Sequence, residues 1–313
     1  MFIVLNTSEN QISGKAPFLN ANPIVYIFVV LAVVFFLYQF IGGVIQYLAV
    51  GIDFSSTTGK LAATRIIITF SQFAFILAPA IFFSLLQGDK IKDTFRLKPP
   101  KPSVFVLSVI GIFTVQPFIQ LYMYFQNKII FSLPFANEFL KSMKELFDSL
   151  EASTLRLVTA YSVSEFLVIV LVIAITPAIC EEFLFRGFVL SNFEKKSKEA
   201  AAIFFSGLLF AMFHFHPFNL IPLTLLGIFL SFIAYHSGSI LTAIVCHFIN
   251  NFISALAVFL YGKDEFISKD IPADEVSQVV TMGIVSLVLF ALVVFAILKL
   301  SATRKVNRLQ IIE

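Results

Sequence analysis

Long apolar stretches separated by short polar segments dominate the 313-residue chain. An α-helix needs about 20 mostly apolar residues to cross the hydrocarbon core of a bilayer. By that rule the pattern predicts about eight transmembrane helices, over residues 24–50, 66–87, 104–126, 163–190, 200–216, 218–236, 240–261 and 279–299. The predicted fold class is therefore all-α, a polytopic membrane helical bundle.

Composition strengthens the membrane assignment. Hydrophobic residues make up 58% of the chain and charged residues 13%, whereas a soluble domain carries about 25% charged residues. The lipid bilayer is therefore an expected partner. No solvent-exposed basic domain is present in the sequence, so we expect no nucleic-acid partner.

The distribution of lysine and arginine predicts the orientation. Basic segments follow the second, fourth and eighth predicted spans, at residues 90–101, 195–198 and 304–308. With eight spans all three segments fall on one side, and short basic loops favour the cytoplasmic side. We expect an integral, multi-pass membrane protein with both termini in the cytoplasm.

One segment outside the spans is also organised. Residues 135–151, "FANEFLKSMKELFDSLE", place apolar side chains at helical spacing with charges between them. This segment is too polar to span a membrane, and its pattern is typical of an amphipathic helix lying on the outer surface.

Three charges interrupt the fourth span, in the stretch "AICEEFLFRGF". A charge at the centre of a bilayer costs roughly 2.5 to 3.5 kcal/mol on insertion scales, so such residues are candidates for function. Glu182 and Arg186 are four residues apart and can pair on one helix face. Glu181 lies about 100° around the helix and is left free. Pro177, one turn earlier, is expected to kink the helix near these charges.

Two further spans contribute polar groups, His214 in "FAMFHFHPF" and His247, Asn250 and Asn251 in "AIVCHFINNF". His247 and Asn251 share a helix face because they are four residues apart, whereas Asn250 points elsewhere and is expected to contact another helix. Each group also has a purely structural interpretation. Glu182 and Arg186 are then an ion pair that stabilises the bundle, and His214 and His247 are hydrogen-bond partners between helices. Together the three helices predict a polar cavity within the bundle.

These side chains suit the hydrolysis of an amide without a covalent intermediate. A carboxylate and a histidine can polarise a water molecule, while a second imidazole and an amide donate hydrogen bonds to an oxyanion. A zinc site formed by Glu181, His214 and His247 is the competing reading, since two histidines and a carboxylate are a catalytic zinc ligand set. However, the sequence contains no H-E-x-x-H motif.

Three motifs carry a resemblance to a known family. "EEFLFR", "FAMFH" and "HFINN" fit the patterns E-E-x-x-x-R, F-x-x-x-H and H-x-x-x-N, in this order on successive membrane helices. In this respect the chain resembles the CPBP family. That family comprises the type II CAAX prenyl endopeptidases and the bacterial Abi-type proteins of bacteriocin processing and self-immunity.

The resemblance implies roles for the motif residues. Glu181 and His214 would activate the water, and His247 with Asn251 would form the oxyanion hole. The supporting residues would be Glu182, Arg186 and Phe210. The implied protein is an intramembrane endopeptidase without a cofactor that cuts membrane-associated peptide or protein substrates, in CAAX-type or leader-peptide processing. A zinc-dependent protease, a non-catalytic immunity protein that binds a peptide, and a proton-coupled transporter are the alternatives.

The resemblance also divides the chain. Residues 160–262 are predicted to form a CPBP-like catalytic core. Residues 1–159 precede it with transmembrane helices and the amphipathic helix, and residues 263–313 follow with the last span and a basic tail.

Overall fold

The computed structural model describes residues 16–51, 57–132, 138–262, 271–272 and 274–310, and these residues contain helices and no strand. Seven helices of the described part are long and apolar enough to cross a membrane. They cover Pro23–Val50, Thr58–Leu86, Pro102–Ile129, Val163–Glu194, Pro217–Ser237, Ile240–Tyr261 and Val276–Ala302. The predicted all-α, multi-pass membrane bundle is therefore confirmed.

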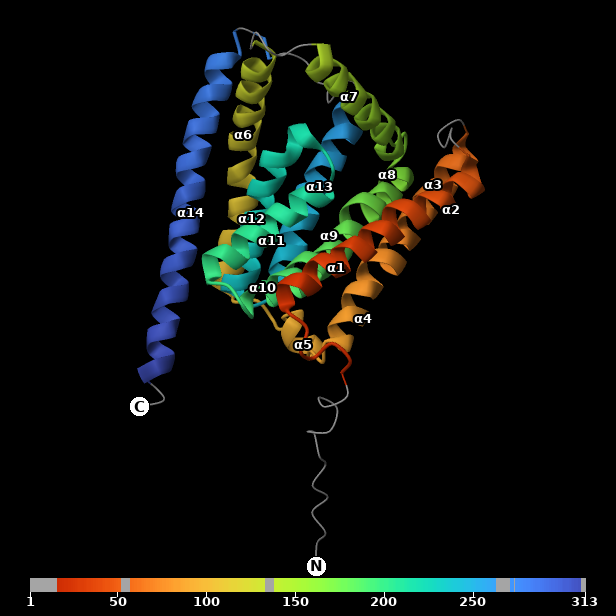
Figure 1. Ribbon diagram of the computed structural model, residues 1–313. Coiled ribbons are helices and arrows are strands. Elements are labelled where there is room, and N and C mark those ends of the chain that lie inside the picture. Colours follow the sequence, from red (N-terminus) through yellow and green to blue (C-terminus); the bar gives the residue numbers. More distant parts are fainter. Residues whose placement is uncertain (1–15, 52–56, 133–137, 263–270, 273, 311–313) are drawn as a thin grey trace, which may run out of the picture.

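The first two spans lie together on one side of the bundle, and the third lies on the opposite side beside the last span (Figure 1). The first two each contain a π-helical segment between two α-helices: α1 (Pro23–Phe35), η2 (Phe36–Ile41) and α2 (Gly42–Val50), then α3 (Thr58–Gln72), η3 (Phe73–Leu77) and α4 (Ala78–Leu86). A short helix, α5 (Ile91–Thr94), leads to the third span, α6 (Pro102–Ser132). Side chains such as Leu48 and Ile66 are 77% and 68% exposed, as expected of helix faces that meet lipid tails.

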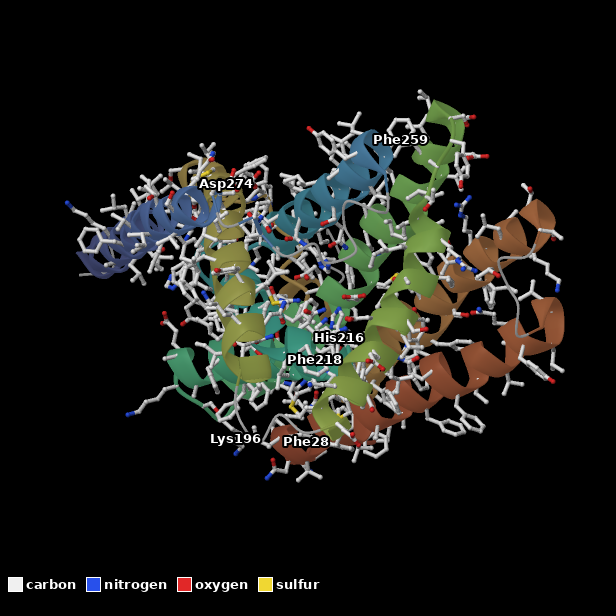
Figure 2. The ribbon with its side chains drawn as sticks, turned by 90° about the horizontal axis from the view of Figure 1, so that it is seen from above. Phe28, Lys196, His216, Phe218, Phe259 and Asp274 are labelled. Carbon is white, nitrogen blue, oxygen red and sulfur yellow. The ribbon has the colours of Figure 1, made fainter. Side chains whose placement is uncertain are left out.

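The amphipathic segment forms α7 (Glu138–Val158). It continues beyond the predicted end at residue 151, and residues 135–137 of the prediction lie outside the described part. Seen from above, α7 crosses the end of the bundle beside His216 and Phe218 (Figure 2). The Phe147 ring of α7 packs on both of these rings, at centroid distances of 4.9 and 6.1 Å.

The fourth span is a single rod over residues 163–194, made of five segments. They are α8 (Val163–Ile169), η4 (Val170–Ile175), α9 (Thr176–Glu182), η5 (Phe183–Val189) and α10 (Leu190–Glu194), of which η4 and η5 are π-helical. The rod holds many of the buried residues of the main hydrophobic core. Its central position follows from its near-continuous apolar sequence.

The segment predicted as the fifth span is shorter than expected. It forms α11 (Glu199–Phe213), a 15-residue helix, about 22 Å long at 1.5 Å per residue against a hydrocarbon core of about 30 Å. A 3₁₀ turn, η6 (Pro217–Asn219), leads into α12 (Leu220–Ser237), which returns along α11. The two helices form a hairpin, so the chain direction still alternates as predicted, although α11 alone is too short to cross.

Two further spans, α13 (Ile240–Tyr261) and α14 (Val276–Gln310), complete the fold. Helix α13 packs on the 163–194 rod, and α14 packs on α6 (Figure 1). Helices α11, α12 and α13 each contact η5, the segment of the rod that carries Arg186.

The basic segments lie at one end of the bundle. Lys195 pairs with Asp89 at 2.8 Å, and Arg96 pairs with Glu194. Helix α14 ends at the same end of the bundle, which is the lower end in Figure 1. This arrangement agrees with the expectation that the basic segments share one side, while the identity of that side stays a prediction.

Candidate active site

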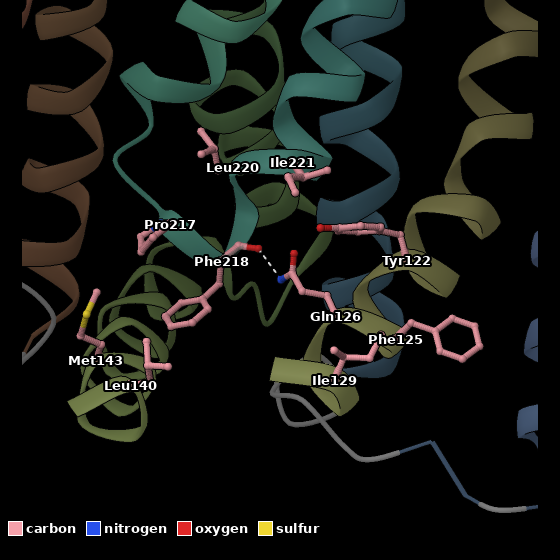
Figure 3. Close-up of a pocket in the computed structure, with 10 residues that line it drawn as sticks. All are labelled: Tyr122, Phe125, Gln126, Ile129, Leu140, Met143, Pro217, Phe218, Leu220 and Ile221. Carbon is pink, nitrogen blue, oxygen red and sulfur yellow. Dashed lines mark hydrogen bonds between the residues drawn. The ribbon is translucent and has the colours of Figure 1, made fainter. Parts of the chain in front are cut away.

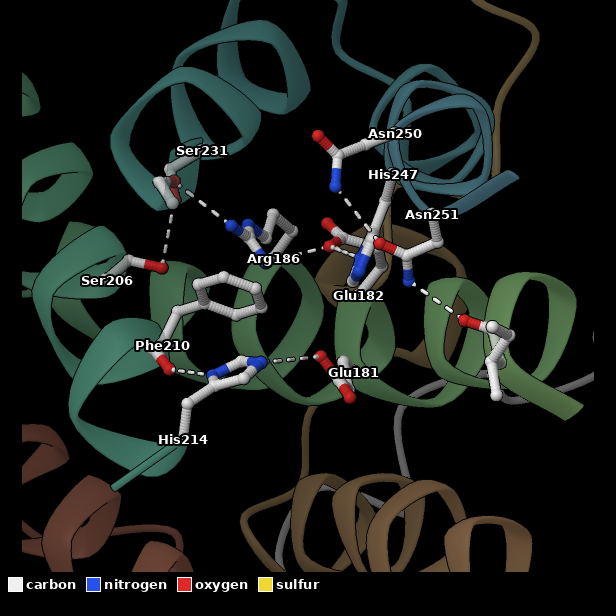
Figure 4. Close-up of polar contacts among 12 residues, drawn as sticks. Glu181, Glu182, Arg186, Ser206, Phe210, His214, Ser231, His247, Asn250 and Asn251 are labelled. Carbon is white, nitrogen blue, oxygen red and sulfur yellow. Dashed lines mark hydrogen bonds and ion pairs between the residues drawn. The ribbon is translucent and has the colours of Figure 1, made fainter. Parts of the chain in front are cut away.

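The predicted site residues lie on three packed elements, namely the 163–194 rod, α11 and α13 (Figure 4). The rod is irregular where it carries its charges, because π-helical segments stand on both sides of α9. Single π-helical turns occur frequently at functional sites. The sequence predicted a distortion at Pro177, which lies in the first turn of α9, but it did not predict the π-helical segments.

Glu182 and Arg186 form the predicted pair, and both side chains are completely buried. The Glu182 Oε1 atom accepts hydrogen bonds from Arg186 Nη1 and from His247 Nδ1, each at 2.8 Å. Arg186 Nη2 donates to the backbone carbonyl of Gly227 at 3.0 Å. The guanidinium carbon also lies 4.4 Å from the centre of the Phe210 ring. One carboxylate and one guanidinium therefore connect α9, η5, α11, α12 and α13.

Glu181 faces a different environment from its neighbour. Its Oε2 lies 3.9 Å from His214 Nε2, and the two side chains are 17% and 33% exposed. His214 Nδ1 is 2.8 Å from the backbone oxygen of Phe210. A carbonyl oxygen only accepts hydrogen bonds, so Nδ1 donates to it and Nε2 is the ring nitrogen that faces Glu181. At 3.9 Å the two groups are too far apart for a direct hydrogen bond, and a water molecule can bridge them.

Asn251 is held by a series of amides. Its Nδ2 donates to the backbone carbonyl of Ile173 at 3.1 Å, and its Oδ1 accepts from Asn250 Nδ2 at 3.1 Å. Asn250 Oδ1 in turn accepts from Gln116 Nε2 of α6 at 2.7 Å. Asn250 thus contacts a second helix, as expected from its position on α13. Gln116 was missed by the sequence reasoning, although an amide inside an apolar span was a signal for it.

The structure brings some predicted partners together and separates others. Glu181 and His214, from different helices, face each other across a short distance, in spite of the shortness of α11. His247 and Asn251 project from one side of α13 toward the rod (Figure 4). Their partners differ, because His247 contacts Glu182 and Asn251 contacts the Ile173 carbonyl.

The zinc reading requires Glu181, His214 and His247 to converge on one point. Within the described residues, no group of three His, Cys, Asp or Glu side chains is arranged to hold a metal ion. His247 turns Nδ1 to Glu182, whereas His214 turns Nε2 to Glu181. The described side chains, as they are placed here, do not fit a three-ligand zinc site.

A separate apolar pocket of about 650 Å³ lies between α6, α7, η6 and α12 (Figure 3). Gln126 lines it and donates to the Phe218 carbonyl at 2.7 Å. None of the predicted site residues is among the lining residues. The pocket is therefore distinct from the Glu181–His214 contact, although Pro217 and Phe218, in the turn that follows His214, line it.

Residues 163–253 match the family described as type II CAAX prenyl endopeptidase, Rce1-like. No curated protein matches the chain, and no solved structure matches it. The match runs from the first residue of α8 into α13, so it contains the three motifs and confirms the resemblance inferred from them.

Proposed function

Because residues 163–253 form a domain of the Rce1-like family of type II CAAX prenyl endopeptidases, we propose that the protein is an intramembrane endopeptidase. It hydrolyses a peptide bond in a membrane-associated peptide or protein substrate. The observation that carries the proposal is the Glu181–His214 contact, where the buried Glu181 Oε2, which has no hydrogen-bond partner among the described residues, faces His214 Nε2 at 3.9 Å. Peptide hydrolysis is the chemistry of the matched family.

In this proposal Glu181 and His214 act on water. A water molecule between Glu181 Oε2 and His214 Nε2 donates one O–H to each of them. As its oxygen attacks the peptide carbonyl, a proton passes to the Glu181 carboxylate, which acts as general base. The same proton then reaches the nitrogen of the leaving amine as the C–N bond breaks. The Phe210 carbonyl keeps His214 in the tautomer that this role requires.

The developing oxyanion is stabilised by His247 and Asn251. The His247 ring is oriented by the bond from Nδ1 to Glu182, so Nε2 is the atom that can face the substrate. To stabilise the oxyanion, Nε2 must carry a proton and donate it. Asn251 has two N–H groups and gives one to the Ile173 carbonyl, which leaves the other for the oxyanion.

The buried pair of Glu182 and Arg186 supports this site without touching the substrate. Both side chains have no exposed surface, and their bonds hold His247 and the α11–α12 hairpin around the rod. Glu182 and Arg186 carry opposite charges and pair at 2.8 Å. A balanced set of charges reduces the cost of holding ionised groups within the membrane.

The division of the chain and its orientation complete the proposal. Residues 160–262 form the catalytic core, and the end of the bundle that carries Lys195 and Arg96 faces the cytoplasm, as the positive-inside tendency favours. Both termini then lie in the cytoplasm.

The proposal is tested by cleavage of defined peptides with detergent-purified full-length protein. The probes are a fluorescence-quenched peptide that ends in a farnesylated Cys-aliphatic-aliphatic-X sequence, the same peptide without the prenyl group, and a leader-type peptide. Bound metal is measured on the same samples. We expect cleavage of at least one probe that Glu181→Ala abolishes. Absence of cleavage of all three probes by folded wild-type protein, or full cleavage by Glu181→Ala, would contradict the proposal.

A further inference from the structure

Three amide side chains form a directed series that ends beside the proposed oxyanion hole. Gln116 Nε2 donates to Asn250 Oδ1 at 2.7 Å, and Asn250 Nδ2 donates to Asn251 Oδ1 at 3.1 Å. Asn251 Nδ2 then donates to the backbone oxygen of Ile173 at 3.1 Å. The series crosses from α6 through α13 to η4, so it connects a helix outside the matched residues 163–253 to the site.

The direction of the series is fixed at its last member. The Ile173 oxygen is a carbonyl and can only accept, so Asn251 must turn Nδ2 toward it. In a regular α-helix the Ile173 carbonyl would receive a hydrogen bond from the backbone nitrogen four residues later. That residue is Pro177, which has no N–H to give. Ile173 itself lies in the π-helical η4, and its carbonyl accepts from the Asn251 amide at 3.1 Å.

The opposite end of the series depends on Gln116. An Asn side chain can turn its oxygen and nitrogen around at little cost unless its partners distinguish them. Asn250 Nδ2 donates to the Asn251 oxygen. The orientation of the Asn250 amide is in turn fixed by the hydrogen bond that Gln116 donates to Asn250 Oδ1. Without that donor, Asn250 loses one of the two partners that fix its amide, and only the Asn251 oxygen still selects its Nδ2.

We propose that Gln116 and Asn250 are positioning residues, which orient the Asn251 amide so that its second N–H faces the oxyanion. This inference rests on the proposed function. A turned Asn251 amide would place its oxygen where the oxyanion forms, and the two oxygens would repel each other. Gln116 thus acts on the reaction through two other side chains and without contact with the substrate.

Two substitutions at position 116 separate orientation from packing. Gln116→Met keeps the length of the side chain and removes the donor. Gln116→Glu keeps the shape, but an ionised carboxylate only accepts, so it cannot donate to Asn250 Oδ1 and competes with Asn251 for the Asn250 Nδ2 donor. Gln126→Met is the matched control, because Gln126 lies on the same helix and donates a bond of equal length, 2.7 Å, to the Phe218 carbonyl.

The kinetic expectations follow from the role of an oxyanion donor, whose loss costs about 10²–10³ in kcat. Asn251→Ala should show this loss. Gln116→Met should lower kcat by about tenfold and leave KM unchanged, because the interaction is made in the transition state. In the Asn251→Ala background, Gln116→Met should have no further effect on kcat. Gln126→Met should leave kcat within about twofold of the wild type.

The dependence of kcat on pH separates an orienting role of position 116 from a packing role, because packing alone does not change with pH. The new carboxyl of Gln116→Glu can donate to Asn250 when protonated and cannot when ionised. The kcat of this variant, divided by that of the wild type, should therefore fall as the pH rises. The same ratio for Gln116→Met should not change with pH.

A second measurement tests the series without catalysis. The unfolding temperatures of Gln116→Met, Asn251→Ala and the double variant form a cycle in which the two losses should not add, because the residues share one network. Additive losses, or a kcat loss in Gln116→Met that persists in the Asn251→Ala background, would overturn the inference while leaving the proposed function intact. If the wild type cleaves no probe, the proposed function fails. The unfolding temperatures still test the series of amides in that case, and additive losses would contradict it.

Discussion

Glu181 and Glu182 are neighbours in the sequence and occupy opposite environments in the structure. The Glu182 carboxylate is completely buried and accepts from both Arg186 and His247. The Glu181 side chain is 17% exposed, and its buried Oε2 faces His214 Nε2 at 3.9 Å. One carboxylate is fixed by two short bonds, and the other faces a gap that a water molecule can bridge.

This difference separates stability from chemistry. A buried carboxylate bound by two donors holds helices together, and the removal of either partner leaves an uncompensated charge. A carboxylate with an accessible, loosely held partner can exchange a proton with water. The helical turn that carries both residues thus presents one glutamate to the interior and one to the site, because consecutive helix residues point about 100° apart.

The largest expected effect concerns His214, the partner of Glu181. His214→Ala should lower the cleavage rate by about 10²–10⁴, the usual contribution of a general acid–base group. Combined with Glu181→Ala, it should cause little further loss, because the two groups act on one water molecule.

His216→Ala is the matched control for that prediction. His216 lies two residues further on, where it packs on the Phe147 ring instead of facing Glu181. The cleavage rate of the His216→Ala variant should stay within about twofold of the wild type. Equal losses in His214→Ala and His216→Ala would remove the distinction between the two histidines.

The next effect concerns the buried pair. Arg186→Met should destabilise the protein by about 3–5 kcal/mol, because Glu182 would keep a buried charge with one donor fewer. The measurement is the free energy of unfolding in detergent. A double variant, Glu182→Leu with Arg186→Met, should recover part of this loss, since replacing both partners by apolar residues removes the unpaired charge.

A smaller effect is expected at the α11–α12 crossing. A Cβ atom at Gly227 would lie 2.5 Å from the backbone oxygen of Gly207, and the Gly227 carbonyl accepts from Arg186. Gly227→Ala should therefore cost about 1–3 kcal/mol of stability, the usual range for overpacking. Gly43→Ala is the control, because a Cβ there meets nothing within 4 Å, and it should not destabilise.

The smallest effect is expected from metal removal. Treatment with 1,10-phenanthroline should leave the cleavage rate within about twofold, since Glu181, His214 and His247 do not form a ligand group in the described part of the chain. A rate that falls with the chelator and returns with stoichiometric zinc would favour the zinc-dependent alternative instead.

The sequence predicted the local features of the site well. The spacing of Glu182 and Arg186 fixes their contact within one helix, and that contact is observed at 2.8 Å. The same spacing also left Glu181 free for a partner on another helix. Local periodicity is sufficient for these statements, because both residues lie on one rod.

The sequence did not predict which helices supply the partners. The bond from His247 to Glu182 depends on how α13 packs against α9, and the bond from Gln116 to Asn250 depends on how α6 packs against α13. Spacing along the chain contains no information on either packing. The length of α11 was overestimated because no residue before Pro217 marks the end of the helix at Phe213.

The most direct test compares Glu181→Gln with Glu182→Gln, two variants that remove the same charge one residue apart. Cleavage rate and unfolding temperature are measured on both purified proteins. Glu181→Gln should lose cleavage and keep the unfolding temperature of the wild type, whereas Glu182→Gln should unfold at a clearly lower temperature. Wild-type cleavage by a folded Glu181→Gln protein would contradict the assignment of Glu181 as the residue that activates water.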